Sequence, residues 1–384
     1  MRILLASSSS GSHGGGEIFL LYLGQALIEQ GHSVGLWASD HERMTPLVDA
    51  FSRLGGEIVR APYINTYDLK GRCLSAAMHE QNRDTAIQSW QSWNPDIVHI
   101  NKQNLEDGLD LLAAARAGTV PNICTIHISQ SAKYLKASNA WLRDLVARRC
   151  LNQYPGILTA VADSRRDELA DFVDIDNSRI RRVYNGTPNP ALTNRDRWRA
   201  EKRAELGLSD EEILVTMVAR LTAQKAPQHF LDVATSMQQQ HKNVRFLWVG
   251  DGDFAQQWDQ TVAQRGLERA VMRVGWQEEV QPWLAATDAY LHTAAYEGLP
   301  LSILEALSFG LPTFLTAPMV EEVAAFNTDD VCVIDEAGAW QNTLLDSMSR
   351  DKFGHRARAL YEREFQVGTM ARNYTGIYEE VLHA

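Results

Sequence analysis

Residues 289–316 read AYLHTAAYEGLPLSILEALSFGLPTFLT and contain a complete strand–helix–strand unit. The apolar run Ala289–His292 predicts a strand, and a helical pattern begins near Leu301 after a turn that contains glycine. Beyond Gly310-Leu311-Pro312, the run Thr313–Thr316 predicts the next strand. A helix between two consecutive strands forms a crossover connection, which places the strands in parallel. This stretch therefore predicts an α/β fold.

The same alternation continues outward in both directions. In the second half of the chain, apolar runs predict strands at Ile213–Ala219, Arg245–Val249, Val271–Val274, Ala289–His292, Thr313–Thr316 and Val331–Ile334. In the first half they predict strands at Ile3–Ala6, Val34–Ala38, Glu57–Ala61, Ile97–Ile100, Asn122–His127, Ile157–Val161 and Arg181–Tyr184. Helical patterns such as Glu17–Gln30 and Leu105–Ala117 lie between these strands. The predicted fold class is two doubly wound α/β domains in tandem, each with a parallel sheet.

A change in composition after Asn185-Gly186 marks the domain boundary. The stretch 187–205 contains Pro and Asn and is then strongly charged, which is typical of a linker. The chain ends in a helical pattern, Val367–Ala384, which we expect to cross back and pack on the N-terminal domain. The predicted domains are residues 1–186 with 367–384, and residues 187–366. The cleft between them is the expected ligand site.

The composition indicates a globular protein. The 384 residues suit two domains of ordinary size, and 45% hydrophobic with 22% charged residues is normal for a soluble protein. No run approaches the roughly 18 apolar residues of a membrane-spanning helix. The first residues, Met1–Ala6, predict a strand rather than a signal peptide, so we expect a cytoplasmic location.

Charge and cysteine usage argue against further classes of function. The formal net charge of −11 disfavours nucleic acid as the main partner. Residues 1–185 carry 19 basic and 20 acidic side chains, whereas residues 186–384 carry 18 and 28, so we expect the halves to contact different partners. The cysteines are widely separated, which disfavours a zinc site or a redox pair. Cys124 lies in an apolar run and is expected in the core.

Two glutamates beside a helix start give the strongest functional signal. Glu297 lies on the turn before the helix that begins near Leu301, and Glu305 follows about two turns later. A helix start offers free N–H groups and a positive dipole end, which suit a diphosphate. Carboxylates at such a place are expected to accept hydrogen bonds from neutral hydroxyls of a sugar and a ribose. The alternative is a solvated acidic turn and one glutamate on a helix surface.

A pair of cations follows the first strand of the second half. Arg220 and Lys225 come after the strand that ends near Ala219, so they are expected at the strand's carboxyl end. Together they could neutralise a nucleoside diphosphate leaving group without a divalent metal. The alternative is two exposed surface cations. Asp251-Gly252-Asp253 resembles a metal-binding DxD motif, but it follows an apolar run and is expected to be a turn, so no metal site is predicted.

In the first half, a glycine-rich loop and a histidine are the candidate ligand contacts. The loop, residues 11–17, reads GSHGGGE and links the first strand to the first helix, where glycines let the backbone approach a ligand. It does not match GxGxxG, because Phe19 stands three residues after Gly16, and Asp40 alone is weak evidence for NAD binding. His127 closes an apolar strand, and a structural role for it stays open.

Taken together, these motifs resemble glycosyltransferase family four, the large retaining group of the GT-B fold. The E-x7-E element of that family is matched by Glu297 and Glu305. The resemblance implies two Rossmann-like domains that face a central cleft. It also implies that Glu297 contacts donor-sugar hydroxyls, that Glu305 contacts the ribose, and that the backbone at Leu301, Ser302 and Ile303 holds the distal phosphate.

The resemblance also assigns roles to the other motifs. It makes Arg220 and Lys225 phosphate ligands, although Ala219 and Ala226 stand where the family usually has glycine. It places the glycine loop near the substrates. It also implies that a histidine after the fifth strand bonds the donor sugar, and that the loop after Val271–Val274 lies over the base. The remaining residues assigned in this way are Gly15 and Trp276 for the donor, His13 and Gly14 for the acceptor, and His127 for the sugar.

The motifs and the resemblance that they carry together imply a retaining, metal-independent glycosyltransferase without a cofactor. We expect a nucleotide-sugar donor, with UDP favoured, and a saccharide or lipid-linked saccharide as acceptor, as in cell-surface polysaccharide synthesis. The expected catalytic residues are His127, Glu297, Arg220 and Lys225. The alternatives are a catalytically idle nucleotide-sugar-binding module and a sugar-nucleotide epimerase of the same fold. An NAD-linked oxidoreductase is disfavoured because the glycine fingerprint is missing.

Residues 131–156 predict either a membrane contact or an ordinary amphipathic helix. The segment is basic, with Asp144 as its single acidic residue, and aromatic and leucine side chains alternate with the cations. Such a segment could lie on an anionic bilayer surface, here the inner face of the membrane. The alternative is a helix whose apolar side packs inward. The residues concerned are Lys133, Lys136, Arg143, Arg148, Arg149, Tyr134, Leu135, Trp141, Leu142 and Leu145.

Overall fold

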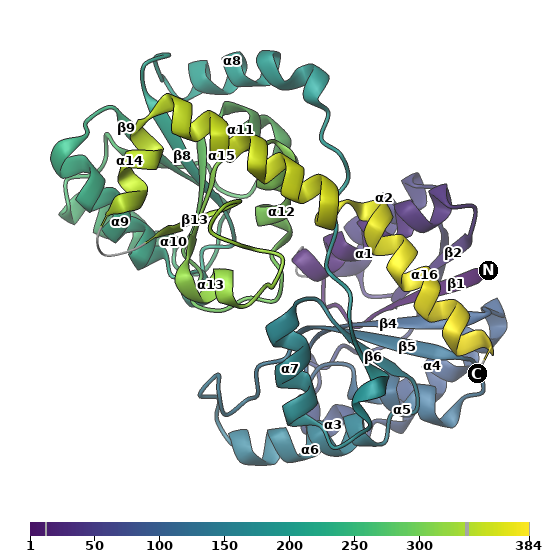
Figure 1. Cartoon of the computed structure of the whole chain (residues 1–384). Coiled ribbons are helices and arrows are strands. Elements are labelled where there is room, and N and C mark those ends of the chain that lie inside the picture. Colours follow the sequence, from purple (N-terminus) through teal and green to yellow (C-terminus); the bar gives the residue numbers. More distant parts are fainter. Residues whose placement is uncertain (12–13, 335–337, 384) are drawn as a thin grey trace. The chain divides into compact units, whose positions relative to one another are not determined.

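A computed structural model describes residues 1–11, 14–334 and 338–383 and divides the chain into two units. The N-terminal unit comprises Met1–Gly186 and Val367–Ala384, and the C-terminal unit comprises Thr187–Gln366. Each unit contains one parallel sheet with helices on both faces (Figure 1). The predicted α/β class with two Rossmann-like, doubly wound sheets is confirmed.

The N-terminal sheet has seven parallel strands in the order β3-β2-β1-β4-β5-β6-β7. The chain changes direction between the neighbours β1 and β4, so the loops after these strands flank the switch point where doubly wound sheets bind ligands. The strands are β1 (Arg2–Ser7), β2 (Ser33–Ser39), β3 (Glu57–Ala61), β4 (Ile97–Asn104), β5 (Asn122–Ile128), β6 (Ile157–Ala160) and β7 (Ile180–Arg182).

Side chains of the N-terminal strands alternate between two helical layers, as the strand period requires. Ile3 and Leu5 pack on one face of the sheet, and Leu4 and Ala6 pack on the other. The first layer contains α1 (Gly15–Glu29), α2 (Thr45–Arg53) and α16 (Val367–His383). The second contains α3 (Cys73–Ala76), α4 (Glu80–Trp93), α5 (Leu109–Ala117), α6 (Ala140–Asn152) and α7 (Asp163–Phe172). Short 3₁₀ turns are η1 (Glu42–Met44) and η2 (Asn177–Arg179).

The last helix, α16, packs on the N-terminal unit, as predicted. Its apolar side chains recur three and four residues apart and complete the core against Phe19 of α1. Two tyrosines add buried hydrogen bonds to the sheet. Tyr378 OH lies 2.7 Å from His99 Nδ1, and Tyr374 OH lies 3.0 Å from Thr125 Oγ1. Burial makes such bonds costly to leave unmade, so they fix where α16 packs.

The C-terminal sheet has six parallel strands in the order β10-β9-β8-β11-β12-β13, with its switch point between β8 and β11. Residues 289–316 form β11, α12 and β12, and Tyr290 pairs with Thr313 in parallel register, as predicted. The strands are β8 (Ile213–Val218), β9 (Val244–Val249), β10 (Val271–Arg273), β11 (Ala289–His292), β12 (Thr313–Thr316) and β13 (Cys332–Ile334).

Helices cover both faces of this sheet as well (Figure 1). They are α8 (Arg195–Glu205), α9 (Pro227–Gln240), α10 (Ala255–Gln264), α11 (Gln281–Ala286), α12 (Leu301–Ser308), α13 (Ala317–Glu321), α14 (Ala339–Leu345) and α15 (Ser347–Leu360). Short turns are η3 (Leu192–Asn194), η4 (Ala223–Lys225) and the π-helical η5 (Tyr361–Phe365). In the described part of the chain, no helix combines the length and apolar character needed to cross a bilayer.

The predicted linker 187–205 is wrong in its second half, which forms α8. Arg199 and Arg203 pair with Asp288 at 2.6 and 3.0 Å, which fastens α8 to the C-terminal unit. Arg203 is only 4% exposed and also donates to backbone carbonyls. The charges that indicated a linker are therefore a helix face whose partner is distant in sequence.

Several element boundaries also differ from the prediction, and β4 extends four residues beyond the predicted Ile100. The helical pattern Leu105–Ala117 yields a helix only from Leu109, because Gly108 adopts a left-handed backbone with φ of 56°. The strand predicted at Arg181–Tyr184 is found at Ile180–Arg182. None of these shifts changes the order of the elements.

Candidate active site

The candidate site of the C-terminal unit lies where β8 and β11 end. These strands are neighbours, with Ala289 opposite Val215, and the switch point falls between them. Lys225 therefore comes from the loop after β8 and Glu297 from the loop after β11. Their side chains are in contact although 72 residues separate them in sequence.

The Glu297 carboxylate is buried and surrounded by donors. Glu297 is 5% exposed, and its Oε1 contacts Lys225 Nζ and lies 3.2 Å from His292 Nε2. Gln224 Nε2 lies 3.3 Å from its other oxygen. A carboxylate with donors from two loops has a fixed position and orientation.

The charge of Glu297 follows from these contacts. Burial raises the pKa of Glu297, but the positive charge of Lys225 and the hydrogen bond from His292 outweigh burial and hold the pKa at about 2. Burial also lowers the pKa of His292, so a neutral imidazole donates Nε2–H to the carboxylate. At neutral pH, Glu297 can therefore accept hydrogen bonds from ligand hydroxyls but cannot act as an acid.

His292 and Gln224 are site residues that the sequence motifs did not identify. His292 is the last residue of β11, five positions before Glu297, and Gln224 lies between the two predicted cations. A histidine at the carboxyl end of a strand beside the switch point was the available signal. Its partner could not be read from the sequence, because the contact depends on how the loop after β11 turns back.

The start of α12 presents backbone groups rather than side chains. Leu301 and Ile303 are 8% and 0% exposed, so their side chains belong to the core. The first N–H groups of a helix have no intrahelical acceptor and are available to an anion. Tyr290 OH donates to Ser302 Oγ at 2.9 Å and fixes this first turn to β11. Glu305 lies on the following turn and is partly buried.

Arg220 and Lys225 occupy different electrostatic environments. Lys225 is partly buried and paired with Glu297. Arg220 is exposed, and across the described residues its guanidinium has neither an ion pair nor a hydrogen bond. Arg220 is thus the cation that can bind a phosphate without first losing a protein partner.

The loops after β10 and β9 contain the predicted donor contact Trp276 and the DxD-like sequence that is expected to be a turn. Trp276 follows β10 and is 59% exposed, so its indole is accessible to a ligand. Asp251 accepts a hydrogen bond from Gly252 N at 2.9 Å and lies 3.3 Å from Arg273, which identifies the DxD-like sequence as a turn after β9. The residues that the structure describes contain no cluster of three or more His, Cys, Asp or Glu side chains suited to a metal.

The glycine loop leads into α1 in the N-terminal unit. Gly14 precedes the helix, Gly15 is its exposed first residue, and a Cβ at Gly15 would have no neighbour within 4 Å. A Cβ at Gly16, in contrast, would overlap the side-chain amide of Gln103 on β4. A side chain at Gly16 would therefore require the flexible Gln103 side chain to move, whereas one at Gly15 would meet no neighbour. The predicted acceptor contact His13 lies outside the described residues.

His127 lies at the end of β5 on the same face as this loop. It is 9% exposed, and its Nε2 lies 2.7 Å from Asn101 Oδ1 of β4. Burial lowers the pKa of His127 to about 4, so the ring is neutral at neutral pH. The Phe19 ring packs edge-on against it at 4.8 Å between centroids. The histidine is thus held by packing on one side and a hydrogen bond on the other.

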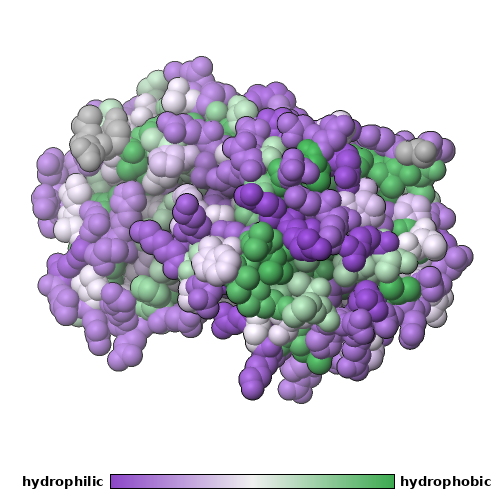
Figure 2. Space-filling view, turned by 90° about the horizontal axis from the view of Figure 1, so that it is seen from below, coloured by the Kyte–Doolittle hydropathy of each residue, from purple (hydrophilic) through white to green (hydrophobic). Residues whose placement is uncertain are grey.

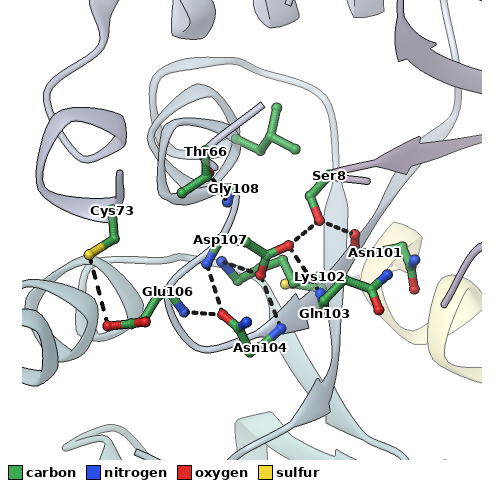
Figure 3. A network of polar contacts seen from close by, with 12 residues as sticks. Ser8, Thr66, Cys73, Asn101, Lys102, Gln103, Asn104, Glu106, Asp107 and Gly108 are labelled. Atoms are coloured by element: carbon green, nitrogen blue, oxygen red, sulfur yellow. Dashed lines mark hydrogen bonds and ion pairs between the residues drawn. The ribbon is translucent and has the colours of Figure 1, made fainter. Parts of the chain in front are cut away.

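A buried polar network joins the two loops at the N-terminal switch point (Figure 3). Ser8 Oγ, directly after β1, lies within hydrogen-bond distance of the Asp107 carboxylate and 2.8 Å from Asn101 O. Asp107 also accepts N–H bonds from Gln103 and Asn104 at 3.1 and 3.0 Å. Lys102 Nζ lies 3.9 Å from Asp107, and both side chains are fully buried. The network fixes the β4 loop against β1.

Two protein-family models match consecutive parts of the chain. The model of glycosyltransferase family four matches residues 13–188, and the model of group 1 glycosyl transferases matches residues 199–358. These ranges contain the N-terminal candidates His127 and Asn101 and the C-terminal candidates Arg220, Lys225 and Glu297.

Curated proteins of related sequence and solved structures of related fold are also glycosyltransferases or bind a nucleotide, in agreement with the family models. An Escherichia coli UDP-Gal:alpha-D-GlcNAc-diphosphoundecaprenol alpha-1,3-galactosyltransferase is 27% identical over 58% of this chain and 57% of its own length. The Bacillus subtilis putative glycosyltransferase EpsF is 23% identical over 58% of each chain, so this chain spans little more than half of these relatives. The structure of Anabaena HepE with UDP and glucose superposes with a TM-score of 0.76 at 19% identity, covering 98% and 99% of the two chains. This similarity establishes the GT-B fold.

Proposed function

Because the chain belongs to glycosyltransferase family four, the group 1 glycosyl transferases, we propose that it transfers a sugar from a nucleotide-sugar donor to a saccharide or lipid-linked acceptor. The observation that carries the proposal is the ionised, buried Glu297 beside the α12 start. On the adjacent loop lies Arg220, whose guanidinium has no partner in the described part of the chain. An acceptor for hydroxyls next to a site for phosphates is what a nucleotide sugar requires.

We further propose that the donor is a UDP-sugar. The support is that the E. coli relative is described as using UDP-Gal and that the Anabaena structure contains UDP. The choice of UDP rests on the names of these two proteins. Backbone contacts to a base would not distinguish uracil from another base.

The proposed reaction retains the anomeric configuration and needs no metal. The bond between the anomeric carbon and the diphosphate oxygen breaks, and its electron pair stays on the diphosphate. The negative charge of the diphosphate is stabilised by Arg220, Lys225 and the α12 N–H groups. The acceptor oxygen bonds to the anomeric carbon on the same face, and its proton passes to the departing phosphate oxygen. Glu297 holds a donor hydroxyl throughout, and His127 accepts a second hydrogen bond.

Thermal unfolding with UDP, GDP, ADP and dTDP tests the donor site. We expect UDP to stabilise the protein with or without EDTA, and Arg220→Ala to lose most of this stabilisation. Failure of all four nucleotides would refute the proposal. Binding without turnover would support the idle module, and an epimerised nucleotide sugar would support the epimerase. Determining the anomeric configuration of the product by NMR tests retention.

We propose that the enzyme works in the cytoplasm at the inner face of the membrane, through residues 131–156. Trp141, Tyr134 and Leu145 are 71%, 58% and 56% exposed, and the cations Lys133, Lys136, Arg148 and Arg149 around them are exposed too. The inward face of α6 packs through Ala147 and Leu151, so the exposed apolar residues are additional to its core contacts. Figure 2 views the side on which α6 lies in Figure 1 and shows hydrophobic areas among hydrophilic side chains.

Sedimentation with vesicles tests this contact. We expect binding to vesicles rich in phosphatidylglycerol but not to phosphatidylcholine vesicles, and weaker binding at high salt. Trp141→Ser should weaken binding, whereas Met348→Ser, which removes an even more exposed apolar side chain from α15, should not. Equal binding by both variants would contradict a specific membrane surface.

A further inference from the structure

Asn101 connects three elements of the N-terminal site. It is fully buried on β4, opposite Thr125 of β5, so its side chain shares a sheet face with His127 two residues further along. Its Oδ1 lies 2.7 Å from His127 Nε2, and its Nδ2 lies 3.1 Å from Gly16 O at the start of α1. One amide thus joins β4, β5 and the glycine loop.

These two contacts fix the orientation of the amide. The carbonyl oxygen of Gly16 can only accept a hydrogen bond, so the NH₂ group of Asn101 must face it. The amide oxygen therefore faces His127, and this oxygen can also only accept. Consequently, His127 must carry a hydrogen on Nε2.

The neutral charge of the His127 ring follows from its burial, which lowers its pKa. The neutral ring carries one hydrogen, and Asn101 places it on Nε2, so Nδ1 keeps a lone pair. Within the described residues, Nδ1 has no hydrogen-bond partner. It is also not among the enclosed polar atoms that lack one, and the residue is 9% exposed. Nδ1 is therefore accessible and able only to accept.

We propose that Asn101 is a positioning residue that sets His127 Nδ1 as a hydrogen-bond acceptor for a hydroxyl or amine of the substrate. A carboxylate, carbonyl or fluorine at the same substrate position has no hydrogen to donate and is rejected. The chemical identity of the ligand as a sugar rests on the proposed function. The hydrogen on Nε2 follows from the geometry alone.

The surroundings make this arrangement rigid. The Ser8 N–H donates to the backbone oxygen of Asn101 at 3.2 Å, and the Ser8 hydroxyl, which also contacts Asp107, lies 2.8 Å from the same oxygen (Figure 3). Phe19 packs against the His127 ring. A mismatched substrate group would leave a lone pair facing another lone pair. Leaving a polar group unsatisfied costs about 1–3 kcal/mol, roughly a 5- to 150-fold loss in specificity.

Nitrogen-15 NMR of the histidine rings tests the positioning role without any substrate. The full chain is labelled in histidine, and His127→Gln identifies the signals of His127. We expect Nε2–H with an unprotonated Nδ1 in the wild type and a mixture of tautomers in Asn101→Ala. Asn122→Ala, which removes another buried asparagine of the same sheet, should leave the signals unchanged. Nδ1–H in the wild type, or no change in Asn101→Ala, would overturn the proposal.

Substrate analogues test the specificity. The probes are UDP-glucose, its singly deoxygenated and singly fluorinated derivatives, and UDP-glucuronic acid. At one sugar position we expect replacement of the hydroxyl by fluorine or by hydrogen to lower kcat/KM equally, by ~10-fold or more. In His127→Ala, the hydroxyl should lose this advantage over fluorine and hydrogen. A fluorinated analogue as good as the hydroxyl at every position would overturn the specificity. If the wild type turns over no UDP-sugar, the proposed donor fails and the tautomer measurement decides the role of Asn101 by itself.

Discussion

The two units share an architecture but build their candidate sites from different chemistry. Both have a parallel sheet, and both place functional loops at the switch point. The C-terminal site contains ionic groups, with Glu297 paired to Lys225 and, nearby, Arg220, which has no partner among the residues that the structure describes. The N-terminal site presents backbone at Gly15 and a neutral histidine whose hydrogen is fixed by Asn101. The first arrangement suits a charged leaving group, and the second suits the recognition of neutral hydroxyls.

Replacing Glu297 should have the largest effect. Glu297→Ala leaves Lys225 partly buried without a partner, so we expect a loss of about 3 kcal/mol in the free energy of unfolding. Turnover should fall by ~100-fold or more. Glu297→Gln keeps the shape and an acceptor oxygen and should be more stable than Glu297→Ala but still impaired. Urea unfolding and donor kinetics measure both, and wild-type turnover in Glu297→Ala would remove Glu297 from the site.

Acid should destabilise the N-terminal unit first. Burial lowers the pKa of His99 to about 3 and that of His127 to about 4, below the unfolded value of about 6.5. The unfolded state therefore binds more protons between pH 6.5 and 4, and stability falls as pH falls through this range. Between pH 6.5 and 4.5 we expect a loss of about 2 kcal/mol per histidine.

The C-terminal unit should be destabilised less by acid, and at a lower pH. In its described residues, one histidine has a pKa clearly lowered by burial, His292. The pKa of Glu297 is held at about 2, so its contribution is lost only as pH falls below its unfolded value of about 4.5. Amide hydrogen exchange in β5 and β11 at pH 6.5 and 4.5 compares the units. Equal loss of protection in both would contradict the difference.

Replacing each cation of the C-terminal site in turn should distinguish effects on UDP binding from effects on stability. Arg220→Ala should lower UDP affinity by ~10-fold and change unfolding by less than about 0.5 kcal/mol, because Arg220 has no partner to lose in the described residues. Lys225→Ala should impair both, because it leaves Glu297 unpaired. Calorimetric titration with UDP and chemical unfolding test the pair. Equal stability of the two variants would show that the Lys225–Glu297 pair has no net effect.

Gly15→Ala should have a small effect on stability, and a stabilising one. Gly15→Ala adds a Cβ that meets no neighbour at a helical position, so the free energy of unfolding should rise by up to about 1 kcal/mol. Turnover should nevertheless fall if a ligand approaches this backbone. Gly16→Ala is the matched contrast, since its Cβ would displace the Gln103 amide and should therefore stabilise the protein less than Gly15→Ala. Unchanged turnover in Gly15→Ala would exclude close approach at this position.

Local sequence patterns predicted most of the fold because the spacing of apolar residues determines which faces of a strand or helix are buried. Apolar runs of four to eight residues bury both faces of a parallel strand, and the helical patterns between them dictate crossovers. The prediction failed at α8 because local composition cannot show that Arg199 and Arg203 have Asp288 as a partner. A charged helix and a charged linker look alike until that partner is located.

The part of the candidate site whose residues lie close together in the sequence could be predicted. Glu297, Glu305 and the start of α12 lie within nine residues, so their spacing alone places them around one turn. His292 and Asn101 were missed because their roles depend on partners set by loop shape and strand register. Neither residue type is informative by itself.

The sequence by itself determined the alternation of strands and helices, the two parallel sheets and the motifs at the strand ends. These follow from periodicity and local backbone preference, which act within a few residues. Only the tertiary structure decided which side chains meet. It paired Lys225 with Glu297 across 72 residues and His127 with Asn101 across 26. Such contacts set charge and hydrogen position, because burial removes water as an alternative partner and makes the choice of protein partner decisive.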